Sequence, residues 1–191
     1  MSVFEFVLGL LSIVGSLAIT HLVTGVAQLI RHRKRVKFSL LQLLWMLSAF
    51  SITVGNWAEN WEYRSLAAWP AWSILLNILS GVGNYLICYL VTPEIEGDGP
   101  IDLVDFQARE RNSYLGAFIG LGLLSLALNP IFGAAADFQG WFRDSLLVFV
   151  ALFFAILALL VKAKWAQWIG AAGFAAVSIY FMVLATNVAT S

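Results

Sequence analysis

The sequence has little charge, few histidines and a single cysteine. Only 12% of its 191 residues are Asp, Glu, Lys or Arg, whereas 61% are hydrophobic. An average soluble domain carries roughly a quarter charged residues, so a chain this apolar is expected to have a membrane as its solvent. The one cysteine, Cys88, excludes an intrachain disulfide. The net charge of zero gives no bulk attraction to nucleic acid, so no nucleic-acid partner is expected.

The sequence also lacks the motifs of common membrane enzymes and cofactor proteins. His21 lies in an apolar run and His32 in a basic loop, so no histidine pair is placed to hold a haem across the bilayer. No His, Asp and Glu cluster has the spacing of zinc or di-iron ligands, and GxSxG, HExxH and P-loop motifs are missing. No lysine falls in the middle of an apolar run, which excludes a retinal Schiff base. We therefore expect no cofactor, no metal and a function other than catalysis.

Long apolar runs are what the sequence has in abundance. A bilayer core needs about 20 apolar residues per helix. The first run is about 25 residues long and its charges follow it, so a membrane span is expected there in place of a cleavable signal. All four prolines fall at the edges of runs, where helices begin or end. The sequence predicts an all-α polytopic membrane bundle, a single transmembrane domain over 1–191, with six transmembrane helices at about 4–30, 38–58, 71–92, 113–129, 145–161 and 165–187.

The basic residues segregate to alternate loops. Nine of the 11 lie in loops 31–37, 93–112 and 162–164, and only Arg64 and Arg143 lie elsewhere. Because positively charged loops stay in the cytoplasm, these three loops are predicted to be cytoplasmic and both termini to be outside. The run 31–37 is therefore interpreted as a topology signal, which also attracts anionic lipids of the bilayer. Its expected partner is the acidic loop TPEIEGDGPIDLVDFQARERN, in which 101–111 fits a short interfacial helix.

Polar residues form stripes within the first three apolar runs. In the first run they recur every four residues, at Ser12, Ser16, Thr20, Thr24 and Gln28. An unpaired polar group in hydrocarbon is costly, so we expect the stripes to face the bundle interior, with the asparagines of the second and third runs pointing toward Thr20. The candidate residues of this polar interior are Ser16, Thr20, His21, Thr53, Asn56, Asn77, Ser80, Asn84 and Tyr85.

Two interpretations of the stripes are open at this point. They are either hydrogen-bonded contacts between helices or the lining of a hydrated cavity that binds a solute. His21 likewise fits a packed side chain, a proton-sensitive group or a ligand contact. A hydrated pocket that reaches Asn77 and Asn84 favours solute binding, whereas a dry interior with a flat apolar face favours a scaffold.

Glycines in the fourth and sixth apolar runs indicate surfaces where helices pack closely. Gly116 and Gly120 have GxxxG spacing in the fourth run, and Gly170 and Gly173 lie in the sixth. Glycines at such spacing let helices approach closely. They predict a homo-oligomer or a membrane-protein partner that packs on the fourth and sixth helices.

Three segments of the chain resemble a known family. FEFVLGLLSIVGSLAITHLVTGVAQLIRHRKRV, LLQLLWML and the acidic PEIEGD followed by DFQARERNSYLGAF are similar to small uncharacterised bacterial multi-pass membrane proteins. The resemblance covers most of the chain, and its first two-thirds most clearly. It implies six helices in a bacterial cytoplasmic (inner) membrane, and it implies no activity, substrate or site residue.

These observations predict an integral inner-membrane protein that binds or translocates a small solute or ion. The site is expected in the polar interior of the first three helices. The alternative is a non-catalytic accessory or assembly subunit of a membrane complex, held by the packing faces of the fourth and sixth helices.

Overall fold

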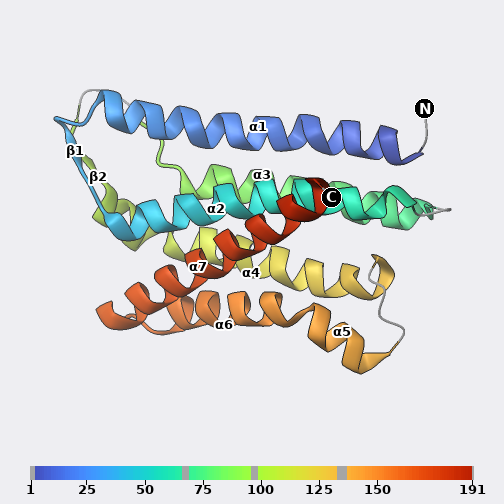
Figure 1. The fold of residues 1–191 in the computed structure, drawn as a ribbon. Coiled ribbons are helices and arrows are strands. Elements are labelled where there is room, and N and C mark those ends of the chain that lie inside the picture. The colour runs from blue at the N-terminus through green and yellow to red at the C-terminus, as the bar shows by residue number, and fades with distance from the viewer. Residues whose placement is uncertain (1–2, 66–68, 96–98, 133–136, 191) are drawn as a thin grey trace.

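The chain forms an all-α bundle, as the sequence predicts (Figure 1). A computed structural model describes residues 3–65, 69–95, 99–132 and 137–190. The helices are α1 (Val3–Arg31), α2 (Leu40–Glu59), the 3-10 helix η1 (Asn60–Ser65), α3 (Ala71–Val91), α4 (Leu103–Phe132), α5 (Phe138–Asp144), α6 (Leu146–Leu160) and α7 (Lys164–Thr190), and the two short strands are β1 (Val36–Lys37) and β2 (Ile101–Asp102).

The number of membrane-crossing helices depends on how α5 and α6 are counted. Within the described residues, five helices are long and apolar enough to cross a membrane: α1, α2, α3, α4 and α7. The short helix α5 and the 15-residue α6 meet at a 58° bend, and together they supply a sixth span if the bent pair is counted as one. The bend falls at Ser145, which ends α5 and begins α6.

The start of α4 differs from the expected end of a long loop near residue 112. The helix begins at Leu103, so the short interfacial helix expected at 101–111 and the fourth span are one continuous element. Asp102 caps it, because its Oδ1 accepts hydrogen bonds from the backbone N–H of Val104 (2.8 Å) and Asp105 (3.1 Å). Nothing between Leu103 and Asn129 breaks the helix, since this stretch contains neither proline nor a turn motif.

The helices pack in an order that places α1 at one edge and α6 at the other (Figure 1). Helix α1 packs mainly on α3, and α4 lies against both α3 and α6. Helix α7 packs on α6 and on α2, crossing from one to the other. Glycines allow both crossings: Gly170 of α7 lies against Ala158 of α6, and Gly55 of α2 lies against Phe181 of α7.

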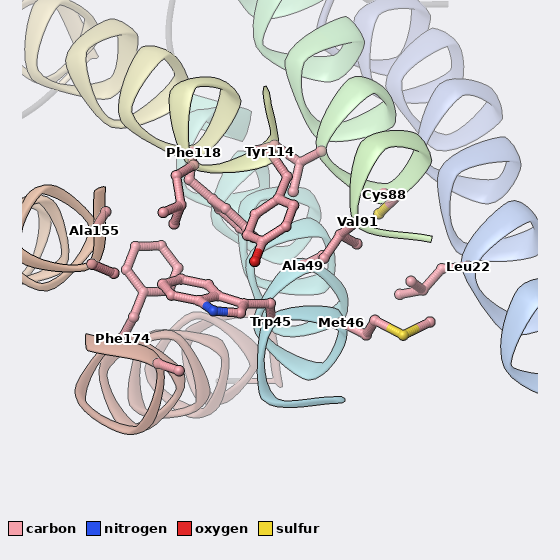
Figure 2. Packing of buried hydrophobic residues seen from close by; sticks show 14 of the residues in the cluster. Leu22, Trp45, Met46, Ala49, Cys88, Val91, Tyr114, Phe118, Ala155 and Phe174 are labelled. Carbon is pink, nitrogen blue, oxygen red and sulfur yellow. The ribbon is translucent and has the colours of Figure 1, made fainter. Parts of the chain in front are cut away.

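An aromatic cluster fills the centre of the bundle, where α2, α4 and α7 meet (Figure 2). The Trp45 ring lies 5.9 Å from Tyr114, 5.6 Å from Phe118 and 5.3 Å from Phe174, measured between ring centroids. None of these rings is more than 3% exposed. Burying such large rings creates a large apolar contact between these three helices.

The basic first loop and the acidic third loop are joined by a short parallel strand pair. In this pair Val36 lies opposite Ile101 and Lys37 opposite Asp102. The Lys37 Nζ contacts Asp102 Oδ2 at 2.8 Å, and the Arg35 guanidinium donates two hydrogen bonds to the Gly99 carbonyl oxygen. The Lys37 ammonium holds the pKa of the Asp102 carboxyl below its usual value. The contact between the basic and acidic loops that the sequence predicts is therefore present, in the form of β1 and β2.

Candidate functional site

A polar pocket opens between α2 and α3 near the end of the bundle that holds the N-terminus and α5 (Figure 1). Leu11 and Gly15 of α1 close one side of the pocket, and Ser125, Leu128 and Asn129 of α4 close another. Its volume is about 50 Å³, which is room for a few water molecules. The polar residues that line it are Thr53, Asn56, Trp57, Glu59, Asn60, Tyr63, Asn77, Ser80, Asn84, Ser125 and Asn129.

Three asparagines form the middle of this pocket. The side-chain amide of Asn56 donates to Asn84 Oδ1 across the α2–α3 interface, at 3.1 Å. Asn84 donates in turn to the Ser80 carbonyl oxygen (3.0 Å), and Asn77 donates to the Ser73 carbonyl oxygen (3.1 Å). Asn77 and Asn84 are each 6% exposed. A side-chain amide has two N–H donors and two acceptor lone pairs, so these bonds leave hydrogen-bonding capacity for a bound molecule.

The pocket ends at a packed layer of side chains toward the β1–β2 end. Thr53 lies at this depth, where its hydroxyl donates to the Ala49 carbonyl oxygen (2.8 Å) and lies 3.4 Å from Cys88 Sγ. Ala49, Cys88 and Trp45 are fully buried just beyond it.

The rim of the pocket is built where α2 gives way to η1. Asn60 donates to the Asn56 carbonyl oxygen at 2.6 Å, and its own Oδ1 is buried without a hydrogen-bond partner among the described residues. The Trp57 indole N–H donates to Ser12 Oγ of α1 at 2.9 Å, which ties α1 to the rim. Glu59 supplies a carboxylate to the same rim. The unpaired Asn60 Oδ1 makes this rim a place for a hydrogen-bond donor.

The structure brings together five of the nine candidate residues. Thr53, Asn56, Asn77, Ser80 and Asn84 all line the pocket. The other four lie elsewhere, because Ser16 and Thr20 are exposed and His21 and Tyr85 are half-buried outside the pocket. All the candidate residues of α2 and α3 except Tyr85 therefore line the pocket, and none of the candidate residues of α1 does.

The expectation that the polar stripe of α1 faces the interior is wrong. Ser16, Thr20, Thr24 and Gln28 are exposed, and α1 instead turns Val7, Leu11, Ala18, Leu22, Gly25 and Leu29 inward. The hydroxyls of Ser12 and Ser16 donate to the carbonyl oxygens of Leu8 and Ser12, each at 2.7 Å. Hydroxyls that donate to a carbonyl oxygen of their own helix require no partner in the bundle interior. The face of α1 that packs inward is then the one that fits closely against α3.

His21 belongs to a separate aromatic group on α1 and α3. Its ring lies 5.0 Å from Tyr89 and 6.4 Å from Tyr85, measured between centroids. Tyr89 donates to the Glu94 carboxylate at 2.6 Å. No group of three or more His, Cys, Asp and Glu side chains that could hold a metal ion occurs in the described part of the chain.

Several lining residues were not predicted from the sequence. Ser125 and Asn129 come from α4, which the sequence patterns assign to packing, and Trp57, Asn60 and Tyr63 come from the α2–η1 junction. The spacing of Ser125 and Asn129, one helical turn apart, was the available signal. For Asn60 the signal was its four-residue spacing from Asn56. Trp57 and Tyr63 had none, because the chain leaves α2 in a 3-10 turn that no periodicity marks.

A second, larger cavity adjoins the polar pocket and shares Asn56, Glu59, Ser125 and Asn129 with it. It lies between α2, α4, α6 and α7, and its volume is about 380 Å³. It is lined mainly by apolar side chains, in contrast to the asparagine-lined pocket.

Comparison with known proteins adds no family to this description. No family model, no curated protein and no solved structure matches the chain. The functional assignment therefore depends on the geometry of the two cavities.

Proposed function

We propose that this protein binds a small polar solute in the asparagine-lined pocket and passes it into or across a membrane. The proposed location is a bacterial cytoplasmic membrane, with both termini outside and the β1–β2 end in the cytoplasm. The positive-inside distribution of Lys and Arg supports this orientation. The observation that carries the function is the joint burial of Asn77 and Asn84 in a polar pocket near one end of the bundle.

The cost of burying these amides supports a binding function. Asn77 and Asn84 keep hydrogen-bonding capacity beyond the bonds described above, and burying unpaired polar groups costs free energy that apolar residues at the same positions would avoid. The asparagines are connected across α2 and α3 by one side-chain bond, between Asn56 and Asn84. A single such bond contributes about 0.6 kcal/mol in membrane proteins, too little to account for the five asparagine amides that line one pocket.

The size and charge of the pocket restrict the solute. A volume of about 50 Å³ admits water or a solute of a few non-hydrogen atoms. Neither Lys, Arg nor His is among the described residues that line it, and Glu59 lies at the rim. These features favour a neutral, hydrogen-bonding solute or a small cation, and they disfavour an anion.

Solute flux into proteoliposomes tests the proposal. Urea and glycerol serve as neutral probes, and rubidium serves as the cation probe. Asn77→Leu should reduce the flux of one of these probes by about tenfold or more, since it removes the amide and fills the pocket with an apolar side chain. Asn112→Leu is the matched control, because Asn112 is an exposed residue of α4 outside the pocket.

Three results would distinguish the interpretations. A loss of urea or glycerol flux identifies a neutral solute, and a loss of rubidium flux identifies a cation site. If Asn77→Leu leaves every flux at the wild-type value and only lowers the melting temperature in detergent, the asparagines are packing contacts and the proposal is wrong.

The alternative, an accessory subunit, is favoured by one observation on α4. A Cβ atom added at Gly116 or Gly120 would have no neighbour within 4 Å, so the GxxxG face is open on the surface of this chain. A face of this kind suits a second membrane helix. Native mass spectrometry of the detergent-extracted protein would support this function if a dimer or complex is lost in Gly120→Leu.

A further inference from the structure

The larger cavity results from the path of α7 across the bundle. Near its start α7 packs closely on α6, where a Cβ at Gly170 would come within 2.7 Å of Ala158 Cβ. Farther along it leaves α6 and packs on α2, where Phe181 lies over Gly55. The two helices therefore diverge toward the α5 end (Figure 1), and the cavity of about 380 Å³ lies in the wedge between them. This volume is in the range of small-molecule sites.

The walls of this wedge are apolar and continuous with the outer surface of the bundle. Its floor is formed by Phe118 and Phe174, the members of the central aromatic cluster that face α6 (Figure 2). Its sides carry Val148 and Ala151 of α6, both half-buried, and Leu184 of α7, which is 41% exposed. The cavity thus opens between α6 and α7, at a surface that would contact hydrocarbon in a membrane.

The end of the wedge nearest α5 is polar and carries acidic side chains. Asp144 and Glu59 supply carboxylates there, and Asn129 donates to Ser145 Oγ at 2.9 Å, which fixes α4 to the start of α6. None of the described lining residues is Lys, Arg or His. Arg143 approaches Asp144 at 3.4 Å, but its side chain is 81% exposed and does not line the cavity.

We propose that this wedge is a binding site for a single-chain amphiphile that enters from the hydrocarbon of the bilayer. The apolar chain lies between α6 and α7 over Phe118 and Phe174. The head lies against Asp144, Glu59 and Asn129, so it is a hydrogen-bond donor without negative charge, either an alcohol or an amine. This site adjoins the proposed solute pocket, and the two share the rim at Asn56, Glu59, Ser125 and Asn129. The proposal does not require that the smaller pocket binds a solute.

Photolabelling of the protein in phosphatidylcholine nanodiscs tests the site. The probes are hexadecanol, hexadecylamine and hexadecanoic acid, each with a diazirine on the chain, at a pH where the amine is protonated and the acid ionised. Mass spectrometry should map the alcohol or amine label to the wedge surfaces of α6 and α7. The acid should label these surfaces about tenfold less, because like charges placed together are unfavourable.

Filling the cavity provides the matched variants. Ala151→Phe, or Val148→Phe one turn away if the first does not fold, should abolish labelling of the wedge. Ala172→Phe adds the same side chain at an exposed position of α7 outside the cavity and should leave the labelling unchanged. The double variant Asp144→Asn with Glu59→Gln should remove the difference between amine and acid while the alcohol still labels.

Two results would overturn the proposal. One is equal labelling of wild type and both filling variants, which would mean that the probes react with the outer lipid surface. The other is labelling by the acid as strong as by the amine in the wild-type protein. Because Asn77 does not line the wedge, Asn77→Leu should leave the photolabelling unchanged, and failure of the solute proposal is thereby distinguished from failure of this one.

Discussion

Tyr114 and Trp45 carry polar atoms in the fully buried centre of the bundle. Both side chains are 0% exposed, and neither the Tyr114 hydroxyl nor the Trp45 indole N–H has a hydrogen-bond partner among the described residues. A buried polar group left unpaired costs about 1–3 kcal/mol. The shape of the two rings explains their presence, because they fill the space where α2, α4 and α7 meet (Figure 2).

Tyr114→Phe should therefore stabilise the protein. The change keeps the ring and removes the unpaired hydroxyl, so the free energy of unfolding should rise by about 1 kcal/mol. Tyr89→Phe is the control, since the Tyr89 hydroxyl donates to Glu94 and its loss should bring no gain. The measurement is unfolding in a mixed detergent titration. A lower stability for Tyr114→Phe would show that the hydroxyl has a bound partner in the membrane.

The residues of the candidate site were predictable where helical spacing and the hydrogen-bonding needs of the side chain indicate the same face. Asn77 and Asn84 are two turns apart on α3, and this spacing correctly places both amides in the interior. The same reasoning failed for Ser16 and Thr20, because hydroxyl groups bond to their own helix and do not force a face inward. Asn60 follows Asn56 on the same helical face, four residues on, and this spacing correctly places it beside the other polar residues of α2.

At the scale of the helices, glycines serve two different purposes. At Gly170 the neighbouring helix is in contact, with the Phe154 carbonyl oxygen 3.0 Å from an added Cβ and Ala158 Cβ at 2.7 Å. At Gly116 an added Cβ would meet nothing within 4 Å. The first glycine sets a helix crossing, whereas the second leaves a surface open.

Replacing each glycine by alanine should have opposite effects on stability. Gly170→Ala pushes α7 away from the backbone of α6 and should lower the free energy of unfolding by about 1–3 kcal/mol. Gly116→Ala reduces the conformational freedom of the unfolded chain and should raise it by about 0.5–1 kcal/mol. Thermal unfolding in detergent compares the two. If both variants lost the same amount of stability, the glycine face of α4 would be packed against another chain.

The helices themselves were largely predictable, and the exceptions have physical causes. Hydrophobic length identifies a span in the bilayer independently of neighbouring contacts, so α1, α2, α3 and α7 fall close to their expected limits. Periodicity does not reveal that Asp102 caps a helix ten residues before the fourth apolar run. It also cannot show that α5 and α6 meet at 58°, because a bend depends on packing around Ser145.

At the scale of the whole molecule, the basic residues separate along the bundle axis. The basic β1 loop and the turn between α6 and α7 lie at one end (Figure 1), while α5, with Arg143, lies at the other. The fold keeps apart the charges that the positive-inside rule assigns to opposite sides of the membrane. This arrangement leads to a labelling prediction for the orientation.

In intact spheroplasts, a membrane-impermeant maleimide should label Gln139→Cys and should not label Ala163→Cys. Both positions are exposed, one in α5 and the other in the turn between α6 and α7. The native Cys88 is 0% exposed and should remain unlabelled. Permeabilised cells, in which both variants react, serve as the control. Labelling of position 163 alone would reverse the proposed orientation.

The two strands of the β1–β2 pair are synthesised at different times. Lys37 and Asp102 are 65 residues apart in the chain, and ribosomes add about 5–20 residues per second. The basic loop is therefore synthesised roughly 3–13 s before its partner strand, and α2 and α3 are synthesised during that interval. In the proposed orientation, the charges of this loop would fix the direction of the first helices during those seconds, before the loop becomes part of a folded contact. The same segment would then perform two tasks in succession, first as a topology signal during synthesis and then as a structural contact in the finished protein.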